Sequence, residues 1–150
     1  MSPPEELRFL ILGAQREGNR ILADRVSPLG LTPAQAEVIR CLSDGPPMSL
    51  GALGKLLVCE TGSPSRLVDT LVGRGIVVRR ENPADRRQVT LELSPEGIRL
   101  SDEIRKIETE LYGFISQLMD EDSLTRVLPV LRRLVDGTTS GDAIARRKAR

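Results

Sequence analysis

The sequence predicts a mainly α-helical protein that contains one small β-hairpin. Hydrophobic residues make up 39% of the chain but aromatic residues only 2%, so the core must be aliphatic, which suits packed helices. Apolar residues recur at helical spacing along most of the chain. The stretch QVTLEL, which follows the β-branched run IVVRRE, instead alternates strictly between polar and apolar residues, as a strand does. The order helix, turn, helix, strand, turn, strand predicts a winged helix-turn-helix core between long terminal helices.

The first predicted helix lies between Glu5 and Val26. Its apolar residues recur at helical spacing around a polar middle; they are Leu7, Leu10, Ile11, Ala14, Ile21 and Leu22. A second helix begins after SPLGL, with Thr32 at the N-cap, Pro33 at the first helical position and Gln35 completing a capping box. The sequence SDGPP ends this helix, because its glycine can take a left-handed conformation and its prolines cannot continue a helix.

Two short helices joined by a tight turn form the predicted helix-turn-helix. Ser49 caps the first of them, which runs through Val58, and CETG connects it to the second. The second extends from about Gly62 to Arg74 and tolerates Pro64 because this proline falls in the first turn. We expect this second helix to be the one that reads a partner.

The predicted hairpin follows this helix after Gly75, which acts as a helix stop. IVVRRE and QVTLEL are its strands, and NPADRR is a six-residue turn between them. This assignment puts Arg86 and Arg87 at the projecting tip. Two like charges side by side contribute nothing to folding there, and they are free to contact a phosphate backbone or a narrow minor groove.

A long helix with an apolar stripe begins at Ser94 and Pro95, and DEDS separates it from a last helix that ends near Val135. Apolar stripes on long terminal helices need a surface to cover them, either the centre of the same chain or a second copy, and we favour the second copy. We therefore expect one domain over residues 1–150. Its expected parts are a core at about 31–97, dimerisation helices at about 5–30 and 95–136, and a basic mobile tail at about 137–150.

The composition excludes several classes of chemistry. The chain has no histidine and two cysteines without CxxC spacing, so we expect no zinc or other metal site, no cofactor, and no catalysis that depends on imidazole. Nothing supplies a nucleophile with its base, so we expect no enzymatic activity. No apolar run is long enough to span a membrane, and acidic residues precede the first apolar run, which predicts a cytoplasmic protein without a membrane partner.

The charge distribution points to a polyanionic partner. Residues 61–90 carry six basic and three acidic residues, although the net charge of the whole chain is only +1. Small hydroxyl residues near a helix N-terminus suit a phosphate, and Arg66 is long enough to reach a base edge; alternatively, these serines only cap the helix. The predicted DNA-binding residues are Thr61, Ser63, Pro64, Ser65, Arg66, Thr70, Arg86 and Arg87. Asp69 and Asp85 are predicted to brace the wing.

Two stretches carry a family resemblance: GLTPAQAEVIRCL at 30–42 and RLVDTLVGRGIVVRRENPADRRQVTLELSPEG at 66–97. Together with the flanking helices they resemble the MarR family of bacterial transcriptional regulators over nearly the whole chain. The most specific part is Asp85-Arg86-Arg87 followed by LSPEG, which is similar to the family's Leu-Thr-x-x-Gly. The resemblance implies a homodimer with intertwined terminal helices, whose two lobes read a pseudo-palindromic operator in double-stranded DNA.

The resemblance also implies roles for single residues. The helix matching Ser63 to Arg74 is expected in the major groove and the wing matching Asn82 to Arg87 in the minor groove. An aspartate at the position of Asp69 often pairs with an arginine at the position of Arg87, which leaves Arg86 as the freer DNA contact.

The leading hypothesis is a homodimeric repressor that a small-molecule effector, not identified by any residue, releases from DNA. One alternative is a winged-helix module that binds protein, although such a module has no need for four polar and basic residues on one exposed surface. The other is a regulator that senses oxidants through Cys41 or Cys59. Neither thiol has an evident activating partner, and the first helix lacks the cysteine that peroxide-sensing members place near their N-terminus.

Overall fold

The computed structural model describes residues 1–59, 63–82 and 85–150, with the backbone alone for residues 82 and 85–88. The chain divides into two compact units, residues 1–33 and 34–150. The first unit contains α1 (Pro3–Val26) and a 3-10 turn at Ser27–Leu29. The backbone amide of Ser2 donates to the Glu5 carboxylate (3.1 Å) where α1 begins. Gly30, with φ 69°, ends the 3-10 turn in the left-handed region.

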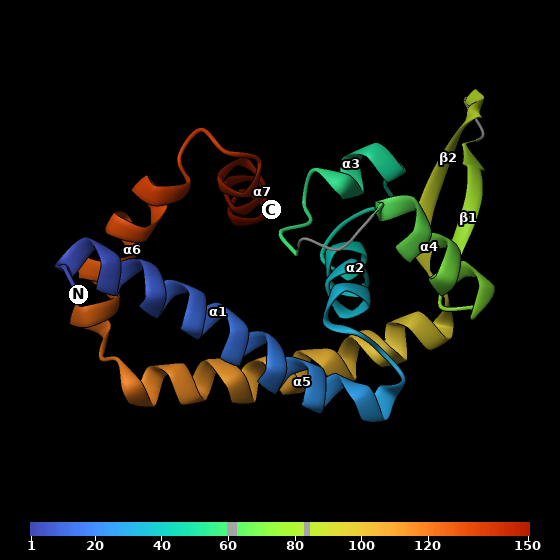
Figure 1. Ribbon diagram of the computed structural model, residues 1–150. Helices are drawn as coiled ribbons and strands as arrows, with labels where there is room; N and C mark the ends of the chain where they lie inside the picture. The colour runs from blue at the N-terminus through green and yellow to red at the C-terminus, as the bar shows by residue number, and fades with distance from the viewer. Residues whose placement is uncertain (60–62, 83–84) are drawn as a thin grey trace. The chain divides into compact units, whose positions relative to one another are not determined.

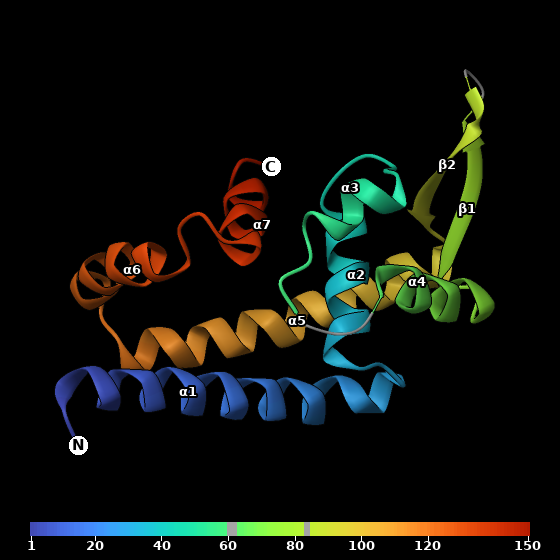
Figure 2. The ribbon, with the colours of Figure 1, turned by 45° about the horizontal axis from the view of Figure 1, so that its top comes forward.

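The second unit holds the predicted helix-turn-helix and hairpin (Figure 1). Its elements are α2 (Pro33–Ser43, whose first residue belongs to the first unit), α3 (Leu50–Gly54), α4 (Pro64–Gly73), β1 (Val77–Asn82), β2 (Asp85–Leu93), α5 (Pro95–Leu118), α6 (Glu121–Val135) and α7 (Thr139–Lys148). Figure 2 shows the hairpin extending away from α4 as a narrow ribbon. The predicted fold class, mainly helical with a small hairpin, is confirmed.

The hairpin is antiparallel, with Val77 opposite Leu93 and Arg80 opposite Thr90. Leu91 also forms a bridge with Met48, with two backbone hydrogen bonds of 2.7 and 3.2 Å that join the α2–α3 connection to β2. The aliphatic core of this unit has side chains with less than 2% exposure from α2 to α5: Val38, Ile39, Leu53, Val68, Leu71, Leu91 and Ile104. The expected aliphatic core is therefore present.

Two segments differ from the sequence expectations. The first helix of the helix-turn-helix ends at Gly54 rather than at Val58, because the backbone beyond it turns toward α2. Residues 137–150, expected as a mobile tail, contain α7: the Thr138 side chain caps it by accepting from the Gly141 amide (3.1 Å), and Ala143 is buried. Within the described ranges, no helix is long and apolar enough to cross a membrane.

Candidate nucleic-acid interface

Helix α4 presents most of the predicted DNA-binding residues. Val68 and Leu71 are fully buried, so the opposite face, with Arg66, Asp69 and Thr70, is exposed. At the start of the helix, Ser63 is the N-cap and Pro64 the first helical residue. The hydroxyl oxygens of Ser63 and Ser65 lie 2.5 Å apart, and the Thr70 hydroxyl donates to the Arg66 carbonyl (2.9 Å). Thr61 lies outside the described residues.

The hairpin differs from the expected wing in one respect. NPADRR was predicted as a turn, but β2 already begins at Asp85, so the backbones of Arg86 and Arg87 belong to a strand rather than to the turn. The side chains of these two arginines and of Asp85 lie outside the described residues. Their roles in DNA binding and in bracing the wing remain predictions.

Asp69 forms an ion pair with Arg79, which joins α4 to β1. The family resemblance predicts Arg87 as the partner of Asp69, and the observed partner is Arg79. The strand IVVRRE indicates that its two arginines have different partners, because successive side chains of a strand point to opposite faces. Arg79 pairs with Asp69 of α4, whereas Arg80 pairs with Glu92 on the neighbouring strand. The pairing of Asp69 with Arg87 stays a prediction.

Glu37 of α2 holds the turn between α3 and α4, a role that no local pattern in the sequence indicates. Its carboxylate accepts from the backbone amides of Val58 and Cys59, at 2.9 Å each. One of the same oxygens lies 2.7 Å from the Arg147 guanidinium of α7. The Glu37 side chain is only 9% exposed, so this carboxylate replaces the water that the two amides would otherwise bind. The turn that leads into α4 is thereby fixed to α2 and α7.

Replacing Glu37 with alanine should therefore destabilise the protein by about 1–3 kcal/mol, because two amides and one guanidinium lose their acceptor. Urea denaturation of the variant gives this value. Asp122→Ala removes a carboxylate from an exposed pair on α6, 3.9 Å from Arg126, and should change stability by less than about 0.5 kcal/mol. Equal losses for the two variants would contradict the role assigned to Glu37.

The two cysteines lie near this carboxylate but are poor candidates for redox sensing. Burial raises the pKa of the Cys41 thiol. Cys59 is exposed, yet partial desolvation and the negative charge of Glu37 raise the pKa of its thiol from about 9 to about 11. Reactive cysteines need the opposite environment, which favours the thiolate.

Cys59 is consequently expected to react with iodoacetamide about a hundredfold more slowly at neutral pH than an ordinary thiol, since its thiolate fraction falls tenfold for each unit of pKa. The rate should rise with pH until about 11. The proton is bound more tightly in the folded state, so stability should also fall as pH rises from about 9 to about 11. Peptide mapping after timed alkylation measures each thiol separately; rapid modification of Cys59 at pH 7 would contradict this prediction.

Arg40 connects α2 to α5. Its guanidinium, 10% exposed, lies 2.8 Å from the Glu108 carboxylate and 3.0 Å from that of Asp44. Because the arginine is nearly buried and doubly paired, it fixes the position of the helix-turn-helix on α5.

Among the residues that the structure describes, no cluster of histidine, cysteine or acidic side chains could hold a metal ion.

Comparison with known proteins identifies one family. The model of the MarR family matches residues 31–89. The chain is 28% identical over 130 residues to the multiple antibiotic resistance protein MarR of Escherichia coli (strain K12), which covers 84% of this chain and 88% of that protein. A regulator from Bacillus subtilis, YcgE, is 41% identical over 63 residues, covering 42% of this chain and 41% of that protein.

Solved structures show the same fold, and they include two complexes with DNA. A mutant of MarR from E. coli complexed with operator DNA has a TM-score of 0.76 and 25% identity, covering 87% of this chain and 94% of that chain. The transcriptional repressor CouR, bound to a 23-mer DNA duplex, has a TM-score of 0.74 and 26% identity, covering 86% of this chain and 92% of that chain. The winged helix-turn-helix arrangement is therefore shared with proteins whose DNA complexes are known.

Proposed function

This chain belongs to the MarR family of transcriptional regulators, and from this premise we propose that it is a homodimeric repressor of a pseudo-palindromic DNA operator. The observation that carries the proposal is the exposed face of α4, where Arg66 and Thr70 stand opposite the buried Val68 and Leu71. A helix presented in this way fits the major groove. The E. coli relative in complex with operator DNA supports this assignment.

The proposed contacts divide into two kinds. Ser63 and Ser65 at the start of α4, with Thr61 before it, suit phosphate oxygens, whereas Arg66 suits guanine through its two-pronged donor geometry. Pro64 starts the helix and Thr70 continues its exposed face. Arg86 and Arg87 on the hairpin are proposed to reach the minor groove, whose negative potential favours arginine. Asp69 and Asp85 are proposed to hold the wing in position.

The proposed dimer rests on apolar side chains that remain exposed on the terminal helices. They include Leu7, Phe9 and Leu10 of α1, Phe114 and Leu118 of α5, and Val130 and Leu134 of α6, each at least 51% exposed except Leu7 at 42%. Exposed apolar area of this extent is typical of an interface between subunits.

We propose that an effector releases DNA by favouring a spacing of the two lobes that does not fit successive major grooves.

The proposal is tested by titrating the protein against a duplex from the region upstream of its own gene. We expect sequence-selective binding whose affinity falls steeply with added salt, together with a dimer mass by light scattering. Binding that is weak, unselective or insensitive to salt would instead favour a protein-interaction module. A monomer mass at the concentration that saturates the duplex would contradict the dimer.

The Asp69 brace is tested by a double-mutant cycle on DNA affinity. We expect Asp69→Ala and Arg79→Ala to be non-additive, because the two side chains form one ion pair between α4 and β1. The parallel cycle with Arg87→Ala tests the pairing that the family resemblance implies. Additive losses of DNA affinity in both cycles would mean that Asp69 does not brace the hairpin when the protein binds DNA.

A further inference from the structure

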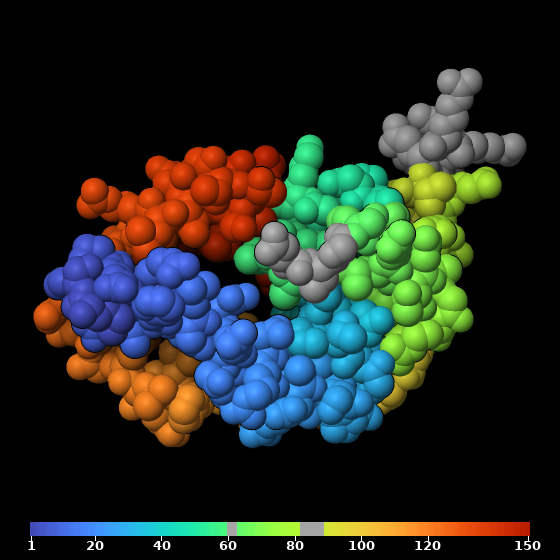
Figure 3. All heavy atoms as spheres, viewed as in Figure 1, coloured from blue at the N-terminus to red at the C-terminus, as the bar shows by residue number. Residues whose placement is uncertain are grey.

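A second basic surface lies between α3 and α7. Two contacts join the C-terminal segment to α2: Arg147 of α7 pairs with Glu37 at 2.7 Å, and the guanidinium of Arg150, just after α7, donates to the Cys41 carbonyl at 3.2 Å. Ala143 of α7 is buried. These contacts place α7 beside α3 in both ribbon views (Figures 1 and 2). In Figure 3 the red C-terminal residues border the green residues around α3. The basic end of the chain thus lies on the helix-turn-helix.

The two helices line a groove of about 710 Å³. Its lining includes the small residues Gly51 and Ala52, and its charged residues are Lys55, Arg146 and Arg150. Among the described lining residues none is acidic. Within the described part of the chain, Lys55 and Arg146 take part in no ion pair. The groove therefore concentrates positive charge that the fold itself does not use.

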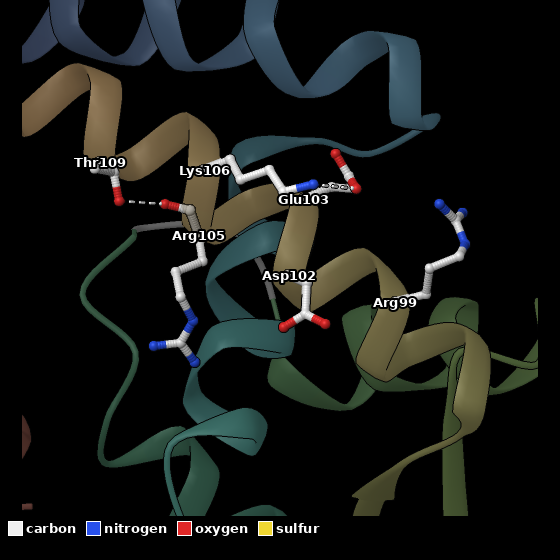
Figure 4. Close-up of a pocket in the computed structure, with 6 residues that line it drawn as sticks. All are labelled: Arg99, Asp102, Glu103, Arg105, Lys106 and Thr109. Atoms are coloured by element: carbon white, nitrogen blue, oxygen red, sulfur yellow. Dashed lines mark hydrogen bonds and ion pairs between the residues drawn. The ribbon is translucent and has the colours of Figure 1, made fainter.

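Other grooves of the same unit differ in charge. The groove along α5 is lined by both basic residues, Arg99, Arg105 and Lys106, and acidic residues, Asp102 and Glu103. The Lys106 ammonium donates a hydrogen bond to the Glu103 carboxylate at 2.9 Å, drawn as a dashed line in Figure 4. A groove bounded by α2, β2 and α5 likewise combines acidic and basic residues. A cationic lining without carboxylates is therefore a particular property of the α3–α7 groove and not of the whole surface.

We propose that the α3–α7 groove binds the phosphate backbone of the same DNA duplex that α4 reads, through Lys55 and Arg146. This inference rests on the proposed function. Because α3 packs directly on α4, where Gly54 lies against Pro64, a duplex held by α4 lies close to the neighbouring helix. Phosphates are recognised by point charges without base preference, and the small residues Gly51 and Ala52 leave room in the groove for a DNA backbone. Arg147 acts indirectly, by holding α7 in place.

The test compares Lys55→Ala/Arg146→Ala with the unmodified protein on operator and on unrelated duplex, over a range of salt concentrations. We expect affinity to fall at least about tenfold on both duplexes. The slope of log affinity against log salt should decrease by roughly four, because each of the two protomers loses two phosphate contacts. Arg146→Lys should retain affinity, because a phosphate needs only the charge. The control Lys106→Ala/Arg126→Ala removes the same charge from side chains paired within their own helices and should leave the slope unchanged.

The two proposals fail in different ways. If the unmodified protein binds its operator selectively but the double variant keeps the same affinity and slope, the α3–α7 groove does not contact DNA and the proposed function stands. A loss confined to operator DNA would also overturn the proposal, since a phosphate contact acts on all sequences. If the unmodified protein shows no selective, salt-dependent binding, the proposed function itself fails.

Discussion

Arg66→Ala is expected to weaken operator binding about 10- to 100-fold and to relax the preference for one base pair. Arg66 is exposed on α4, on the face opposite Val68 and Leu71. From this position a guanidinium can donate two hydrogen bonds to guanine, and losing such a contact costs about 1–3 kcal/mol of discrimination. Fluorescence anisotropy on operators with single base-pair changes measures affinity and preference together.

The conservative variant Arg66→Lys distinguishes base reading from simple attraction. Lysine retains the charge but loses the planar two-pronged geometry, so most of the base preference should disappear while part of the affinity remains. If Arg66→Ala weakened all duplexes equally, Arg66 would be a phosphate contact only. An unchanged affinity would remove Arg66 from the interface.

Local patterns were sufficient to predict the hairpin and most of the helices. The apolar residues of QVTLEL recur with a period of two, and a helix could not place them all on one buried side. The Ser94-Pro95 pair starts α5 as expected. The end of α3 could not be predicted in the same way. It depends on the Glu37 carboxylate, which is 21 residues away from Val58 in sequence and holds the chain after Gly54 in a turn.

The candidate site shows the same division between local and long-range information. Helical periodicity placed Arg66, Asp69 and Thr70 on the exposed face of α4, but it could not select the partner of Asp69, since that choice depends on how the hairpin lies against α4. The helix over residues 139–148 had local signals: a threonine cap, an acidic first turn and a basic last turn. The contact of its Arg147 with Glu37, which lies 110 residues earlier in the chain, had no local signal in the sequence.

Gly97→Ala is expected to destabilise the protein by about 2–3 kcal/mol, although alanine is the better helix former. A Cβ on Gly97 would lie 2.3 Å from the backbone carbonyl oxygen of Ile76. This carbonyl cannot easily move, because it accepts from the Ser94 amide (3.0 Å), while the Ser94 hydroxyl donates to the Gly75 carbonyl (2.7 Å). The first turn of α5 therefore packs directly on the backbone at the start of β1.

Gly73→Ala is the matched control, because Gly73 is helical and, apart from its chain neighbours and the adjacent helix backbone, no described atom lies within 4 Å of a Cβ at this position. This substitution should raise stability by up to about 1 kcal/mol. Urea denaturation of both variants should thus give changes of opposite sign for the same chemical substitution. Changes of the same sign would mean that the glycine of LSPEG is not required by the close approach of α5 to β1. Opposite signs would give this glycine a steric reason: it lets the long helix start against the hairpin that carries the proposed DNA contacts.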